Sequence, residues 1–437
     1  MPAIAPLVDA LNVPGPVVQQ LNSLCSGSLQ SEGCTAALGQ TLTGAIDNLP
    51  AQALSDVSSA LVPVITALEL PRNVAAVVGL NCSSLPLSTA CANLLNGLAI
   101  QAPAAEQLIT NAAAASLVQT NHQVSDFALS TIVPDSLGRA TGPAATLRSV
   151  TPSVTTFGIS GISQTLHDGF VVKSPHVARN RTLAFDSLDA GITLGMRFEA
   201  SKIANLPPDH LTFGVFGNYT NSDVDFEPDA VLRDFGFRNA GDGNVDSGSG
   251  GAYTLLTNGR LYGLVLASGE FGSASVHDSI LNARSNFDTG GFASSLIGGI
   301  VVPVGAVAKI DFRGSLNYLI CRADDFTDSA NIQYRDGKLE TSSGALSVRL
   351  FTAWQRGQTV FRPFVQGGVD ERFDYDNEIQ VEGVNFSFEE GDTTLFGRVG
   401  LDFDVGDYTQ AYAAFRADHN EDFDTIAGQI GLTVKLN

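Results

Sequence analysis

Apolar and polar residues alternate in short segments from residue 153 to residue 437. Between residues 308 and 320, Ile310, Phe312 and Leu316 fall on one face of an extended chain, whereas Lys309 and Asp311 fall on the other. A period of two places successive side chains on opposite faces of a strand. The apolar face recurs strand after strand, and the opposite face carries charges of both signs. The pattern therefore predicts an all-β transmembrane barrel with its apolar face toward lipid.

The alternation predicts about 12 antiparallel strands connected as a meander. We expect the first strand within residues 153–186, and the others at residues 190–200, 211–225, 244–256, 261–276, 286–302, 306–320, 341–354, 359–370, 394–405, 409–418 and 425–436. Short connections, such as Asn258-Gly259 and Gly406-Asp407, alternate with long ones at residues 226–243, 277–284, 322–340 and 371–392. Short periplasmic turns and long outer loops are typical of outer-membrane barrels.

Charged residues within the predicted strands share the face opposite to the apolar one. A charge on the lipid face near the bilayer centre costs about 2–4 kcal/mol, so we expect these side chains to face the lumen. The predicted lumen-facing charges are Arg197, Glu199, Lys309, Asp311, Arg313, Arg349, Arg362, Asp370, Arg398, Asp402, Arg416 and Lys435.

Residues 1–103 are rich in alanine and leucine and predict a helical N-terminal domain. Cys25 and Cys34 form one closely spaced pair, and Cys82 and Cys91 form another with the same spacing. Such matched pairs are typical of local disulfides in exported proteins, here closing two hairpin repeats. Free buried thiols and a four-cysteine zinc site are the alternatives, although the spacing fits no common zinc pattern. Cys321 has no nearby cysteine, and we expect it to be an unpaired packing residue.

Residues 104 to 130 predict a second long helix. It is long enough to cross a membrane, but Glu106, Asn111, His122 and Asp126 exclude contact with lipid. It either passes through a polar barrel lumen or belongs to the N-terminal domain. Prolines and glycines mark residues 131–152 as a connector. The expected division is a helical domain at 1–103, a pore helix with its connector at 104–152, and the barrel at 153–437.

Composition and motifs narrow the possible functions. The formal net charge of −21 argues against nucleic-acid binding. The six histidines are scattered, and no catalytic motif or phosphate-binding loop is present, so we expect no enzymatic activity and no cofactor. Residues 418–424 resemble a calcium loop but lack its sixth-position glycine and twelfth-position glutamate. The first residues lack a basic leader, and because a barrel must be exported we expect a longer natural N-terminus.

Three segments resemble the translocator domain of the bacterial autotransporter family. Residues 186–196 (DSLDAGITLGM) and 211–226 look like its second and third strands, and residues 361–365 (FRPFV) resemble a later strand. The resemblance implies a 12-stranded outer-membrane barrel, a helix crossing its pore and an N-terminal segment displayed outside. It also implies outer-membrane lipid and the barrel-assembly machinery as partners. The chain departs from the family at its last residue, Asn437, where an aromatic residue is usual.

These observations predict an outer-membrane barrel that exports and displays its own N-terminal helical segment at the cell surface. A passive pore closed by a helical plug is one alternative. A surface adhesin, in which the helical hairpins or the acidic loops bind an extracellular ligand, is another. An enzymatic passenger is the third, although no site for it is visible in the sequence.

Overall fold

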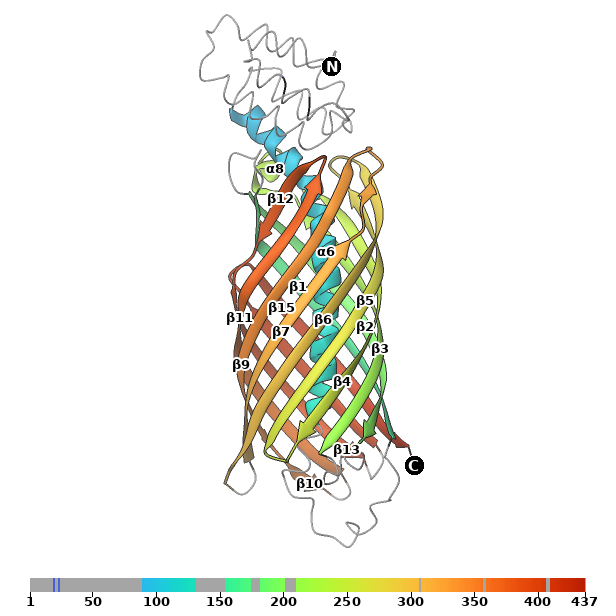
Figure 1. The fold of residues 1–437 in the computed structure, drawn as a ribbon. Helices are drawn as coiled ribbons and strands as arrows, with labels where there is room; N and C mark the ends of the chain where they lie inside the picture. Colours follow the sequence, from blue (N-terminus) through green and yellow to red (C-terminus); the bar gives the residue numbers. More distant parts are fainter. Residues whose placement is uncertain are drawn as a thin grey trace, which may run out of the picture.

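The computed structural model describes residues 19, 23, 89–130, 154–173, 181–200, 210–305, 308–356, 359–405 and 409–436. Twelve long antiparallel strands close into one barrel, in which β15 pairs with β1 (Figure 1). These strands are β1 (Val154–Lys173), β2 (Arg181–Glu199), β3 (Leu211–Glu227), β4 (Gly241–Thr257), β5 (Leu261–Asp278), β6 (Ala283–Val304), β7 (Ala308–Ala323), β9 (Gln333–Thr352), β11 (Thr359–Val381), β13 (Thr393–Val405), β14 (Thr409–His419) and β15 (Phe423–Leu436). The predicted meander barrel is confirmed.

Several strands extend further than the sequence pattern predicted. The predicted loop at residues 371–392 is largely a β-hairpin, because β11 continues to Val381 and β12 (Val384–Glu389) returns beside it. β12 also pairs with β1 through Val171–Lys173, and so bridges across the outer ends of β13, β14 and β15. The predicted loop at 322–340 contains β8 (Phe326–Thr327) and the start of β9, whereas the loop at 226–243 contains helix α8 (Ala230–Asp234). A strand of three residues, β10 (Trp354–Arg356), pairs with β11 at the opposite end.

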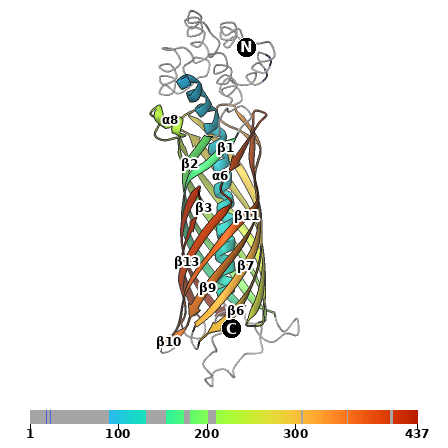
Figure 2. The same cartoon turned by 90° about the vertical axis from the view of Figure 1, so that its left-hand side faces the viewer.

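Helix α6 (Thr89–Ser130) runs through the barrel lumen and extends beyond the rim at its N-terminal end (Figures 1 and 2). It begins at Thr89, before the expected start at Ala104. Pro103 lies within the helix, although proline cannot donate the helical hydrogen bond. None of the described helices combines the length and the apolar character needed to cross a bilayer.

Cys25, Cys34 and Cys82 lie outside the described residues, as does the side chain of Cys91, so the two disulfides stay predictions. Cys321 is buried and unpaired.

Large apolar side chains point outward around the barrel and form its lipid-facing band. Exposed members of this band on the different strands include Ile162, Leu194, Val215, Val265, Leu296, Leu316, Leu346, Val365, Leu395, Phe415 and Ile430. At the end with the short turns, Trp354, Phe361 and Phe403 stack on one another. Aromatic residues of this kind favour the membrane–water interface, so this stack marks one edge of the band.

Toward the end of the barrel with the long connections, the two faces of the strands exchange their character: polar side chains point outward and apolar side chains point inward. On β5, Val265 points outward within the band, whereas Val276 points inward and Ser275 points outward. On β3 the outward positions change from Val215 to Asp223. The inward side chains of this region pack on α6 into a hydrophobic core, which we name the outer collar. Its members include Leu108, Ile109 and Ala112 of α6, with Phe185, Phe226, Val276, Phe287, Cys321, Tyr334, Phe386 and Phe388 of the wall.

The lipid-facing band predicts how β5 tolerates charge. Val265→Arg places a charge on the outward face, where the valine is 55% exposed, and should destabilise the barrel in a bilayer by about 2–4 kcal/mol. Ser275→Arg lies on the same face of the same strand, beyond the band, and should change stability by less than about 0.5 kcal/mol. Unfolding from lipid vesicles by urea measures both. Equal losses for the two variants would place the band elsewhere.

Candidate functional site: the helix-filled lumen

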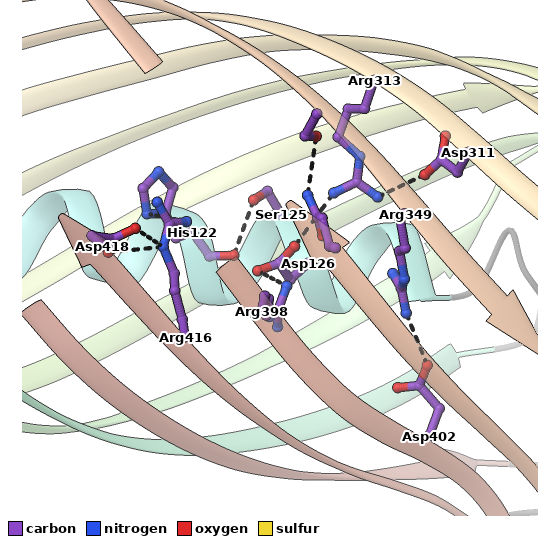
Figure 3. A network of polar contacts seen from close by, with 12 residues as sticks. His122, Ser125, Asp126, Asp311, Arg313, Arg349, Arg398, Asp402, Arg416 and Asp418 are labelled. Carbon is purple, nitrogen blue, oxygen red and sulfur yellow. Dashed lines mark hydrogen bonds and ion pairs between the residues drawn. The ribbon is translucent and has the colours of Figure 1, made fainter. Parts of the chain in front are cut away.

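One carboxylate near the C-terminal end of α6 connects the helix to two strands of the wall. Asp126 forms an ion pair with Arg398 of β13, and its other oxygen lies 3.5 Å from Nη1 of Arg313 of β7 (Figure 3). Arg313 also donates to Asp311 at 3.0 Å and to the Tyr262 hydroxyl at 3.0 Å, and that hydroxyl donates to Asp311 at 2.8 Å. Asp126 is therefore held by guanidinium groups that are themselves held by the wall.

Further arginines surround this point. Nη2 of Arg349 donates to Asp402 at 3.3 Å, and both side chains are almost fully buried. The guanidinium of Arg349 also lies over the ring of Phe364, 3.7 Å from its centroid. Arg362 binds both oxygens of Asp404. Charges removed from water need such partners, because a buried unpaired ion costs several kcal/mol. We name Arg313, Arg349, Arg398 and Arg416 the arginine ring.

Arg416 of β14 approaches the helix one turn before Asp126. Its Nε donates to both oxygens of Asp418, at 2.8 and 3.0 Å, and its Nη1 lies 3.3 Å from Nδ1 of His122 (Figure 3). A neutral imidazole accepts from a guanidinium in this arrangement, because both nitrogens of a protonated histidine are donors. Within the described residues, the C-terminal half of α6 carries only two ionisable side chains, His122 and Asp126. Both contact the arginine ring.

Neutral polar groups hold the middle of α6. The hydroxyls of Ser116 and Ser247 lie 3.3 Å apart. Ser163 donates to Gln119 at 2.9 Å, and Ser268 donates to Asn121 at 2.7 Å. Nearer the N-terminus of α6, Gln107 donates to the Lys338 carbonyl at 3.1 Å, and Asn377 donates to Asn111 at 3.1 Å. These bonds reach β1, β4, β5, β9 and β11, so they fix both the rotation and the depth of the helix.

Three carboxyl groups lie buried in the outer collar, beyond the lipid-facing band. Glu106 of α6 accepts a hydrogen bond from Ser285. Burial raises the pKa of Glu106 well above its ordinary value, the Ser285 bond partly opposes this, and the charges of Asp328 and Asp278 raise it further. Burial raises the pKa of Asp278 to about 6, although the amides of Leu281 and Ile280 donate to it. Burial likewise raises the pKa of Asp328.

The predicted lumen charges take different positions in the structure. Most are buried or half-buried on the lumen face, namely Arg197, Lys309, Asp311, Arg313, Arg349, Arg362, Asp370, Arg398, Asp402 and Arg416. Glu199 is half-buried at the end of β2, whereas Lys435 is exposed near the end of β15. The structure brings five of them, Asp311 and the four members of the arginine ring, close to α6 or to its ion pairs (Figure 3).

The sequence pattern missed the role of Tyr262 and did not bring Glu106 together with Asp278 and Asp328. It also described the lumen as polar throughout, which is wrong for the outer collar, where α6 packs in an apolar core. A signal was present, since residues 104–118 contain mostly alanine, leucine and isoleucine.

The described residues contain no group of three metal-ligating side chains at binding distance. Residues 418–424 span the end of β14, its connection to β15 and the start of β15, and Asn420 donates there to the carbonyls of Gly391 and Thr393, at 2.9 Å each. Asp422 accepts from the amide of Gly391 there. These contacts connect the β14–β15 turn to the β12–β13 connection, which is a structural role.

The lumen contacts can hold a helix in place and exclude water around it.

The fold and the lumen define a membrane β-barrel whose interior is occupied by an α-helix entering from the end with the long connections. The sequence model of the autotransporter β-domain family matches residues 170–416. The chain therefore belongs to that family, whose β-barrels are outer-membrane translocators of bacteria.

Solved structures with a similar fold include autotransporter translocators. The transport unit of AIDA-I from Escherichia coli is 14% identical, with a TM-score of 0.50, and the match covers 66% of this chain and 92% of that one. The translocator domain of NalP from Neisseria meningitidis is also 14% identical, with a TM-score of 0.49, covering 74% and 99%. No curated protein matches by sequence.

Proposed function

We propose that this protein anchors itself in the outer membrane and displays its N-terminal segment at the cell surface, without chemistry of its own. The observation that carries the proposal is the path of α6. The helix passes along the lumen with its C-terminal part at the arginine ring and its N-terminal part emerging past the outer collar (Figure 2). Residues that precede α6 are thereby connected to the end of the barrel with the long connections.

The same contacts support anchoring over conduction. In the described lumen, α6 packs in the outer collar at one end. Near the other end, Phe127 and Leu129 pack in a second apolar cluster beside the ion pairs of Asp126, so the helix occupies the path that an ion would take. A passive pore closed by a helical plug stays the alternative, and the display experiment separates the two. The adhesin hypothesis, in which the helical hairpins or the acidic loops bind an extracellular ligand, is compatible with our proposal, because display would expose both.

Surface display is tested by an epitope tag inserted near Gly39 of the full chain, expressed with a leader for export. We expect external protease to remove the tag from intact cells, because α6 emerges at the outer end of the barrel. A periplasmic marker protein serves as the control and should stay intact. Protection of the tag until the outer membrane is permeabilised would overturn display and favour a plugged pore with a periplasmic domain.

A further inference from the structure

Three carboxyl groups from three separate segments meet the outer part of α6. Glu106 comes from the helix, Asp278 from the end of β5 and Asp328 from the connection between β8 and β9. Their residues are 5%, 3% and 7% exposed, respectively. The connection that carries Asp328 is fastened to β6, because Ser329 donates its amide to the Arg284 carbonyl at 2.8 Å and accepts from the Arg284 amide at 2.8 Å. Asp328 is therefore held in the wall of the collar.

Two oxygens of this cluster have no hydrogen-bond partner, namely Oε2 of Glu106 and Oδ2 of Asp278. The other oxygens are satisfied by hydroxyls and amides: Ser285 donates to Glu106, while Ile280 and Leu281 donate to Asp278 at 2.7 and 2.8 Å. Ala330 and Ile332 donate to Asp328 at 2.9 and 2.8 Å, and Tyr334 lies 3.4 Å from its second oxygen. No basic side chain of the described residues forms an ion pair with any of the three.

Among the charged groups around the cluster, Asp229 before α8 is buried and accepts from the amide of Leu232 at 2.8 Å, whereas the others lie at the surface of the collar. On β5 and β4, His277 faces Asp242, and on β9, Lys338 pairs with Glu340 and Asp376. Arg233 of α8 pairs with Glu227 of β3, Arg284 of β6 is exposed, and Asp324, Asp325 and Glu382 add further negative charge. On α6 itself, the described residues near Glu106 carry no other ionisable group. An ionised Glu106 therefore meets carboxylates and apolar side chains, and no cation compensates it.

We propose that Glu106, Asp278 and Asp328 form a proton-binding latch that holds the outer part of α6 in the collar and loosens as the external pH rises. A buried carboxyl group with an unpartnered oxygen is tolerated when that oxygen carries a proton, because neutralisation removes most of the cost of burial. Ionisation of Glu106 adds a charge beside Asp278 and Asp328 in an apolar core. The least costly response is movement of the helix out of the collar, with the arginine ring still holding its other end.

The sign of the pH dependence follows from the raised pKa of Glu106. A carboxyl group with a higher pKa in the docked state binds more protons there than in the open state. The docked state is therefore fully favoured below the ordinary pKa of 4.5 and loses stability as the pH rises toward the raised value. Asp278 adds to the same trend between its ordinary value of 3.8 and about 6.

Hydrogen exchange of the full chain in lipid vesicles tests the latch. The readout is the protection factor of amides 104–113, which corrects for the intrinsic pH dependence of exchange. Between about pH 4.5 and pH 9 we expect a loss of roughly tenfold or more in the wild-type protein, beginning as the pH rises above the ordinary pKa of Glu106. Glu106→Gln keeps the shape and one hydrogen-bond acceptor of the side chain, and should show no such loss. Asp288→Asn, which removes an exposed carboxylate on β6, should behave as wild type.

A second variant keeps the test decisive if Glu106→Gln folds poorly. Ser285→Ala removes the bond that favours the ionised form of Glu106, so the pH at which protection falls should move upward. Amides 119–126, beside the arginine ring, should stay equally protected at all pH values. The proposal is overturned if the wild type shows no loss of protection, or if Glu106→Gln loses it as the wild type does. These outcomes are independent of whether the N-terminal segment is displayed.

Discussion

Asp126→Ala should destabilise the intact protein by about 3–5 kcal/mol, because removing one partner of a buried ion pair leaves the other charge uncompensated. Arg398 and Arg313 both face this carboxylate, and Asp311, the acid that also pairs with Arg313, is already bonded to Tyr262. Urea unfolding from vesicles measures the loss. We also expect the variant to show intermittent conductance in planar bilayers, because α6 loses its principal attachment in the lumen, whereas the wild type should stay closed.

A second substitution separates lost attachment from general damage. Arg398→Met in the Asp126→Ala background removes the stranded guanidinium and should recover part of the stability, since apolar replacement of a whole buried pair is often close to neutral. Conductance should nevertheless persist, because the helix is still detached from β13. Asp324→Asn, in the outer connection, should change neither property. Unchanged stability and a closed lumen in Asp126→Ala would show that the arginine ring is not what holds the helix.

The inner part of the barrel was predictable because alternation alone decides which way a side chain points. Arg313 and Arg398 were assigned to the lumen by parity with their apolar neighbours, and the structure places both on that face. The alternation could not predict that both arginines pair with Asp126. Asp126 lies 187 residues from Arg313 in sequence, and their meeting depends on strand register, helix depth and helix rotation together. No local pattern contains that information.

The outer collar was missed for a different physical reason. A strand that leaves the membrane exchanges its environments, so polar residues face out to water and apolar residues face in. On β7, Leu316 points outward in the band, whereas Leu319 and Cys321 point inward in the collar. Around this inversion, apolar residues occupy both parities and the alternation is obscured. The segment 371–392 was therefore interpreted as an acidic loop, although Ile379, Val381 and Phe386 form the inner face of a hairpin.

The inversion also explains the composition of α6. Leu108, Ile109 and Ala112 fall where the wall is apolar, whereas Asn121, His122 and Asp126 fall where the wall is polar and charged. Moving the helix along its axis by one turn, about 5.4 Å, would bring unlike groups together at both ends. The two zones thus define a single depth for the helix, which neither zone defines alone. A homogeneous polar lumen would lack this specificity.

Ile109→Ala should cost about 2–5 kcal/mol, because it leaves a cavity in the collar where Ile109 is fully buried. The wall offers a specific repair. A Cβ at Gly243 of β4 would overlap with the Cδ1 of Ile109, so Gly243→Val alone should destabilise by about 1–3 kcal/mol through overpacking. In the double variant the valine occupies the space that the alanine leaves, and the two losses should not add.

We expect a favourable coupling energy of about 1–3 kcal/mol in this double-mutant cycle, measured by urea unfolding from vesicles. Gly263→Val provides the matched control on the neighbouring strand, since a Cβ there meets nothing within 4 Å. Combined with Ile109→Ala, it should give additive effects. Additive losses for Gly243→Val as well would mean that Ile109 does not pack against β4, and that the helix sits at another depth or rotation. Coupling confined to Gly243 would establish the docked position of α6 in the membrane-embedded protein.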